Sequence, residues 1–67
     1  MDNKKLGKKI KIARVELDLT QAALAEMIQS RQKCISRYEN GITLPSLTTL
    51  ERIAKVLEKP TVYFIDS

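Results

Sequence analysis

The clearest structural signals of the chain lie in LTQAALAEMIQSRQKCISRYENG, which runs from Leu19 to Gly41. Thr20 is well suited to begin a helix, because its hydroxyl can accept a hydrogen bond from a free backbone N–H group of the first turn. Asn40-Gly41 is suited to end one, since glycine readily adopts the left-handed conformation that often follows a helix. Between these signals lies the polar segment Gln29-Ser30-Arg31. The stretch therefore predicts two short helices joined by a tight turn.

Apolar residues give each of these helices one inward face. Leu24 and Ile28 are four residues apart on the first helix. Ile35 and Tyr38 are three apart on the second, which spans about 32–39. Both spacings keep side chains on one helical face. The polar and cationic residues on the other face of the second helix are Gln32, Lys33, Ser36 and Arg37. Residues of this kind add little to a core and can reach base edges and phosphates.

A longer helix is expected before this stretch. Asp2 or Asn3 can cap its start, and the helical spacing of apolar residues continues to about Leu17. Its apolar stripe is narrow and lacks aromatic residues, which disfavours a helix lying on a membrane. Ile12 and Val15 fall on the opposite side, where they are either ordinary exposed residues or part of a contact with a partner. The inward residues of this helix are Leu6, Ile10, Ala13 and Leu17.

Two further helices are expected after the stretch. Ser46 can cap a helix that reaches about Leu57, and 61–65 can form one more helical turn with Pro60 at its start. Phe64 should cover the core. The inward residues of the longer helix are Leu47, Leu50, Ile53, Ala54 and Leu57. No segment carries a convincing strand signal, so the sequence predicts an all-α fold of five short helices.

Size and composition limit the class of protein. A chain of 67 residues has one small core and buries only about 60% of the surface that its unfolded form exposes. The single cysteine, Cys34, allows no internal disulfide, fits a reducing cytoplasm and is expected to be a small packing residue. No apolar run approaches the roughly 20 residues of a membrane span, and no signal peptide is recognisable. We expect one cytoplasmic domain over residues 1–67.

The charge distribution is compatible with a polyanionic partner. Twelve Lys and Arg against eight Asp and Glu leave a net charge of +4, and half of the cations lie within the first fourteen residues. Nothing in the sequence indicates an enzyme. It has no histidine, no Gly-rich phosphate loop and no cluster of metal ligands, and its carboxylates are scattered over separate helices. We therefore expect no catalytic residues, no cofactor and no metal.

Several fragments of the chain resemble the Cro/repressor (Xre-like) helix-turn-helix family in their order and spacing. They are Leu19-Thr20-Gln21, Leu24-Ala25-Glu26, Ile35-Ser36-Arg37-Tyr38-Glu39-Asn40-Gly41, Pro45-Ser46-Leu47 and Ile53-Ala54, and the match runs from about Leu6 to Ile65. The resemblance implies a compact lambda-repressor-like domain whose second and third helices form the helix-turn-helix. It also implies a DNA-binding transcriptional regulator, usually a repressor-type homodimer on a palindromic operator of double-stranded DNA.

The resemblance also assigns DNA contacts. In such a unit the second helix of the motif enters the major groove with its N-terminal residues leading, and the first lies across the DNA backbone. It implies phosphate contacts for Gln21 and Asn40. Arg31 stands where the family usually has a capping Ser or Thr, so either Ser30 caps the helix instead or Arg31 exchanges the cap for a phosphate contact. The residues that it assigns to base contacts are Gln32, Lys33, Ser36 and Arg37.

Two structural expectations also follow from the resemblance. Arg14 should form an ion pair with Glu39, which would otherwise place a negative charge on the helix that approaches the phosphates. Loss of one partner of such a pair costs more than the intact pair contributes. Gln29 stands where the family usually has glycine, so a non-glycine residue is expected in a left-handed or otherwise costly conformation.

The C-terminal segment suggests self-association. Val62, Tyr63 and Ile65 are more apolar than the last turn of a small monomer requires, and they are the expected dimer interface. The principal rival to a repressor is a protein-interaction module. Members of the family include antitoxins, which bind a protein partner, and the chain also resembles controller proteins of restriction–modification systems. The sequence does not choose among these roles.

Overall fold

The computed structural model describes residues 2–65 and contains five helices and no strand in this range. They are α1 (Asn3–Glu16), α2 (Gln21–Met27), α3 (Gln32–Glu39), α4 (Leu47–Val56) and α5 (Thr61–Ile65). The expected all-α fold class is confirmed, and α1 and α4 each end one residue before the position expected. None of the described helices combines the length and apolar character that crossing a membrane requires.

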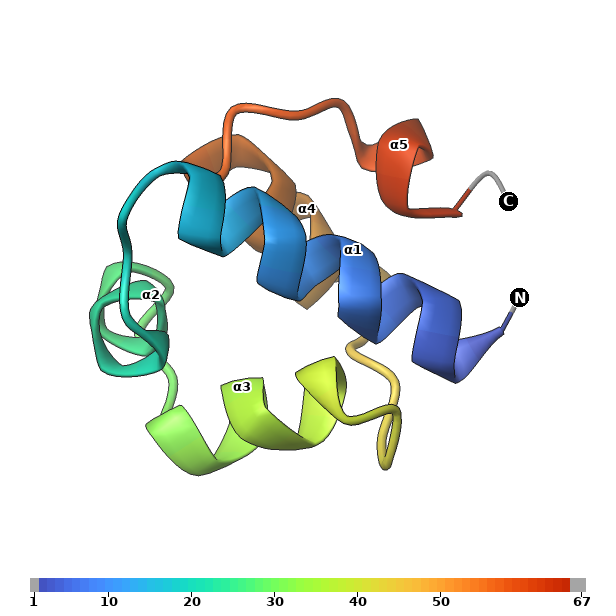
Figure 1. Cartoon of the computed structure of the whole chain (residues 1–67), viewed down its shortest axis with the longest axis horizontal. Coiled ribbons are helices and arrows are strands. Elements are labelled where there is room, and N and C mark those ends of the chain that lie inside the picture. The colour runs from blue at the N-terminus through green and yellow to red at the C-terminus, as the bar shows by residue number, and fades with distance from the viewer. Residues whose placement is uncertain (1, 66–67) are drawn as a thin grey trace.

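The helices pack so that α3 occupies one side of the molecule. α1 contacts α3 and α5, α2 contacts α3 and α4, and α4 contacts α5. Figure 1 shows α3 below α1 and connected to α2, which is seen almost end-on. The chain measures 26 × 23 × 20 Å along its principal axes. No other helix lies below α3 in this view (Figure 1), so the outer face of α3 is open.

Polar side chains begin three of the helices as expected. The Asp2 carboxylate, the Thr20 hydroxyl and the Ser46 hydroxyl each accept hydrogen bonds from backbone N–H groups of the first turn, with shortest distances of 2.9, 2.9 and 3.2 Å. α3 differs, because its N-cap is Arg31 and no side chain caps it. Ser30 therefore does not cap α3: the helix begins at Gln32, and the Arg31 side chain is exposed.

The first four helices all end in the same kind of turn. The residue after each C-cap has a positive φ, with values of 57° at Asp18, 57° at Gln29, 71° at Gly41 and 59° at Glu58. The N–H group of the following residue donates to the carbonyl five residues earlier, at 2.7–3.1 Å. These are the bonds of a Schellman motif. The left-handed conformations expected at Gln29 and Gly41 are confirmed, whereas those of Asp18 and Glu58 were not foreseen.

The core is a single apolar cluster drawn from all five helices. Two residues expected in it are exposed, Leu17 and Leu47. Leu17 follows the last residue of α1, and the turn at Asp18 carries it off the inward face of the helix. Leu47 is the first residue of α4 and lies one turn outside the buried Leu50. The buried apolar residues are Leu6, Ile10, Ala13, Leu24, Ala25, Ile28, Ile35, Leu50, Ile53, Ala54, Leu57 and Phe64.

The outer side of α1 carries an apolar strip. Ile12 and Val15 are exposed there, as their position on the helix indicated. They line a shallow hollow of about 450 Å³. The other residues around it are Lys8, Lys11 and Glu16, all from the same helix.

Tyr63 fastens α5 to the rest of the fold. Lys9 on α1 donates from Nζ to the Tyr63 carbonyl oxygen at 3.0 Å. The Nζ atoms of Lys9 and Lys59 lie 5.5 and 5.0 Å from the centre of the tyrosine ring, within the range of cation–π attraction. The same ring meets Phe64 edge-on, with 5.0 Å between the ring centres. These contacts hold the short α5 against α1, so that Phe64 closes the core.

Candidate nucleic-acid interface

The outer face of α3 combines most of the expected DNA-contacting residues. Gln32, Lys33 and Arg37 are exposed, and the N-cap Arg31 is exposed beside them. Ser36 is half-buried. The Nδ2 atom of Asn40 lies 3.4 Å from the Ser36 hydroxyl oxygen, so these two side chains are neighbours one turn apart. The inward face carries the fully buried Ile35 and the buried Glu39.

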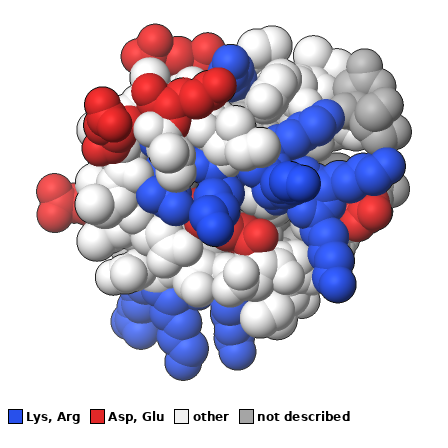
Figure 2. Space-filling model, viewed as in Figure 1, with Lys and Arg blue, Asp and Glu red and all other residues white. Residues whose placement is uncertain are grey.

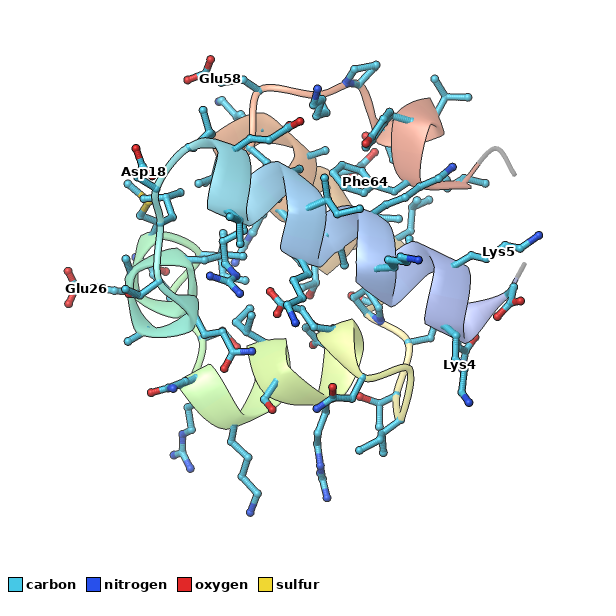
Figure 3. All side chains as sticks on the ribbon, in the orientation of Figure 1. Lys4, Lys5, Asp18, Glu26, Glu58 and Phe64 are labelled. Atoms are coloured by element: carbon cyan, nitrogen blue, oxygen red, sulfur yellow. The ribbon has the colours of Figure 1, made fainter. Side chains whose placement is uncertain are left out.

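The exposed acidic side chains lie away from the α3 side of the molecule. Figure 2 shows Lys and Arg side chains projecting along the edge below α3, where no acidic side chain is visible. In Figure 3, Asp18 and Glu58 lie on the opposite side of the molecule and Glu26 points sideways from α2. The helix from Gln32 to Glu39 contains one carboxylate, that of Glu39. Because this residue is turned inward, the outer face of α3 is cationic along its length.

Glu39 is neutralised by the expected partner. The Nε atom of Arg14 donates to Oε2 of Glu39 at 2.6 Å, and its Nη2 atom donates to Oε1 at 3.1 Å. The relative exposure of the side chains is 11% for Arg14 and 2% for Glu39, so both charges are largely removed from water. Two parallel bonds between a planar guanidinium and a carboxylate fix the relative orientation of the groups. The pair therefore joins α1 to the C-terminal turn of α3.

The ion pair belongs to a network that also reaches α2. The Nη1 atom of Arg14 donates to the Leu19 carbonyl oxygen at 2.6 Å. The side-chain amide of Gln21 donates from Nε2 to Oε1 of Glu39 at 3.0 Å. Within the described residues, no buried side-chain nitrogen or oxygen lacks a hydrogen-bond partner. Gln21, expected only as a phosphate contact, therefore has a second role, in which it ties the start of α2 to the end of α3.

Gly7 determines how closely α1 approaches α3, and the sequence reading did not single it out. A Cβ atom at this position would lie 2.6 Å from the Glu39 carbonyl oxygen and closer still to that of Tyr38. Only a residue without a side chain fits between these backbones. The signal was a glycine inside a strong helical pattern, which often marks close backbone contact.

Tyr38 and Cys34 lie one turn apart on α3, and both are half-buried. Burial raises the pKa of the Tyr38 hydroxyl above its usual value of 10.0, and the neighbouring Cys34 raises it further. Both effects disfavour the ionised phenolate beside the cationic face of α3. Cys34 packs there as the small residue that the sequence suggested.

The residues expected to form a dimer interface are not equivalent. Val62 and Ile65 on α5 are 59% and 41% exposed. Tyr63 is half-buried, and its ring makes cation–π contacts with Lys9 and Lys59 of the same chain. The free apolar surface of α5 therefore comes from Val62 and Ile65.

Together, a five-helix fold and an open cationic helix at the second position of a helix-turn-helix define a class of DNA-binding domains. The sequence model of the helix-turn-helix family matches residues 10–64. The chain belongs to the Cro/repressor (Xre-like) branch of helix-turn-helix DNA-binding proteins. This family consists of DNA-binding regulators, and the chain is accordingly not an enzyme.

Particular relatives include phage and bacterial regulators. The chain is 44% identical over 54 residues to the ImmF control region 10 kDa protein of Bacillus phage phi105, with coverage of 81% of this chain and 60% of the phage protein. The P22 c2 repressor, solved with a synthetic operator, is 30% identical with a TM-score of 0.85, covering 88% of this chain and 89% of that one. PlcR of Bacillus thuringiensis, solved with the peptide PapR7 and DNA, is 41% identical with a TM-score of 0.88, covering 94% of this chain and 22% of that one.

Proposed function

We propose that this protein is a sequence-specific transcriptional regulator of the repressor type, which acts in the cytoplasm and reads operator DNA through the major groove. The observation that carries this proposal is the outer face of α3. It presents Lys33 and Arg37 to solvent, while the acidic Glu39 of the same helix is buried against Arg14. Such a helix can enter a phosphate-lined groove without electrostatic repulsion.

Base reading is assigned to Gln32, Lys33, Ser36 and Arg37. Gln32 begins α3, so it and Lys33 lie at the end of the helix that leads into the groove. A glutamine amide can bond both N6 and N7 of adenine, and a lysine or arginine can donate to O6 and N7 of guanine. Ser36 has the shortest side chain of the four and is half-buried, so its reach is the shortest.

Phosphate contacts are assigned to Gln21, Arg31 and Asn40, at the edges of the α3 face. Arg31 is exposed at the N-terminal end of α3, where no side chain caps the helix. Asn40 is exposed at the C-terminal end. The Gln21 amide bonds Glu39 through one hydrogen and retains a second for a phosphate oxygen. Contacts at both ends would fix the register of α3 on the duplex.

Two copies are proposed to bind as a homodimer on a palindromic operator. Val62 and Ile65 supply exposed apolar surface on α5, and Tyr63 lies between them in the sequence. A two-fold pair of such domains places its reading helices about 34 Å apart, one turn of DNA. This spacing would appear as two inverted half-sites in any selected operator.

The proposal is tested by selecting DNA from a random pool and measuring affinity for the selected and a scrambled sequence. We expect one enriched motif, and binding that weakens steeply with salt. Gln32→Ala and Lys33→Ala should each lose about 1–3 kcal/mol of discrimination between the two DNAs, which is about 5- to 150-fold in the affinity ratio.

Lys55→Ala is the matched control for Lys33→Ala, because it removes the same charge from an exposed position on α4. It should leave the affinity ratio unchanged. If the α3 variants weakened both DNAs equally, the assignment of base readers would be wrong. If no sequence were enriched from the pool, the regulator function itself would be refuted.

A further inference from the structure

The N-terminal turn of α1 lies directly against the exit of α3. Gly41, which ends α3 with a φ of 71°, is so close to Lys4 that a Cβ atom on the glycine would lie 2.9 Å from Lys4 Cγ and 3.1 Å from its Cα. The aliphatic stem of Lys4 therefore rests on the backbone that follows Asn40. Residues far apart in the sequence meet at this corner of the molecule.

The two lysines that begin α1 point in different directions. In Figure 3, Lys4 extends toward the same side of the molecule as the side chains that project below α3, whereas Lys5 extends sideways into solvent. Both are exposed. Only Lys4 therefore continues the cationic edge of α3 beyond the end of that helix.

The Lys4 ammonium is available for an external anion. Within residues 2–65, the ion pairs join Arg14 to Glu39 and Lys59 to Glu16, and neither involves Lys4. The nearby carboxylate of Asp2 accepts hydrogen bonds from the backbone N–H groups of α1, including that of Lys4 at 2.9 Å. The Asp2 carboxylate is thus engaged in capping the first turn of α1.

We propose that Lys4, whose stem rests on Gly41 directly after Asn40, forms a phosphate-binding site for the DNA backbone at the end of each half-site. A lysine ammonium is a compact charge with three donors and binds phosphate oxygens well. Because Gly41 leaves room for the stem, the base of the side chain is positioned before DNA arrives. This inference rests on the proposed function and extends its interface from the helix-turn-helix to α1.

Lys4→Ala and Lys5→Ala form a matched pair of variants for the test. Both remove one charge from neighbouring exposed positions of one helix, and only the first removes a proposed phosphate contact. The affinity for selected operator DNA is measured over a range of salt concentrations. The logarithmic salt slope of Lys4→Ala should fall by about 0.9 for each bound protomer, whereas Lys5→Ala should retain the slope of the unaltered protein. Lys4→Arg should also retain it.

A second measurement locates the contact. Single phosphates of the operator are replaced by uncharged methylphosphonates, one position at a time. At one position, the replacement should lower the affinity of the unaltered protein and of Lys5→Ala. The same replacement should leave the affinity of Lys4→Ala unchanged. Equal slope changes in the two alanine variants, or identical phosphonate profiles, would overturn the site while leaving operator binding by α3 intact. Absence of operator binding by the unaltered protein would refute the proposed function and this site together.

Discussion

At the scale of single residues, Gly7 and Glu39 show how one position can determine the placement of a helix. Gly7 allows the α1 backbone to touch the end of α3, and Glu39 at that end receives Arg14 and Gln21. The two features depend on each other, because the guanidinium reaches the carboxylate only if the helices are close. The open face of α3 is therefore aimed by residues that are themselves buried.

In a Gly7→Ala variant, helix propensity and packing have opposite effects on the free energy of unfolding. Alanine is favoured over glycine by about 1 kcal/mol inside a helix. Its Cβ would nevertheless collide with backbone carbonyl oxygens, which cannot rotate away as a side chain can. We expect Gly7→Ala to lower the free energy of unfolding in urea by about 1–3 kcal/mol. The control Lys8→Ala, at the exposed neighbouring position, should change it by less than about 0.5 kcal/mol. A stabilised Gly7→Ala protein would contradict the close approach of α1 and α3.

At the scale of elements, four helices share one way of ending, and only one of the four turns has the residue best suited to it. Gly41 adopts a positive φ without a steric penalty, whereas Asp18, Gln29 and Glu58 carry a Cβ atom in the same conformation. The penalty is tolerated because each turn recovers two backbone hydrogen bonds at a helix terminus. The turn of the helix-turn-helix is thus built from ordinary helix-ending geometry.

Gln29→Gly should consequently stabilise the protein. Relief of the left-handed strain outweighs the greater flexibility of glycine in the unfolded chain, and the expected gain is about 1 kcal/mol in the free energy of unfolding. The comparison is Glu51→Gly, at an exposed position inside α4, which should lose about 1 kcal/mol instead. Thermal or urea unfolding of the two variants measures both changes. A loss of stability in Gln29→Gly would show that the glutamine side chain makes a contribution larger than the strain.

At the scale of the whole molecule, different sides expose different kinds of side chain. The α3 side is cationic and polar, while α5 exposes Val62 and Ile65. In the proposed function these two faces would serve DNA and a second copy, so that dimerisation would leave α3 uncovered. The contacts of Tyr63 with Lys9 and Lys59 hold α5 in position for the proposed dimer.

Val62→Asp tests whether α5 carries the dimer. A carboxylate in the centre of an apolar contact should raise the dimer dissociation constant by about tenfold or more, which corresponds to roughly 1.4 kcal/mol. Val15→Asp is a matched control, because Val15 is 53% exposed in the apolar strip of α1 and Val62 is 59% exposed. Sedimentation over a range of protein concentrations distinguishes the two. Equal effects of both variants, or a monomer at every concentration, would rule out the α5 interface.

Local sequence signals were enough to predict the helices and the polar outer face of α3. Caps at Thr20 and Ser46 and the period of apolar residues are local signals, since they depend on neighbours within one or two turns. The same periodicity showed that Gln32, Lys33 and Arg37 share an outer face. The periodicity was wrong about Leu17 and Leu47, which continue the pattern. Leu17 lies after the end of α1, and Leu47 lies in the exposed first turn of α4.

The tertiary structure alone decided the contacts between distant segments. The sequence pattern contained no sign that Lys4 rests on Gly41, that Gln21 bonds Glu39, or that two lysines share the Tyr63 ring. The Arg14–Glu39 pair was expected only through resemblance to a family. Such contacts arise from how closely whole helices pack, and this closeness is determined by sterics at a few positions such as Gly7. Local periodicity shows which face of a helix is buried, but the packing of the complete chain decides which atoms meet there.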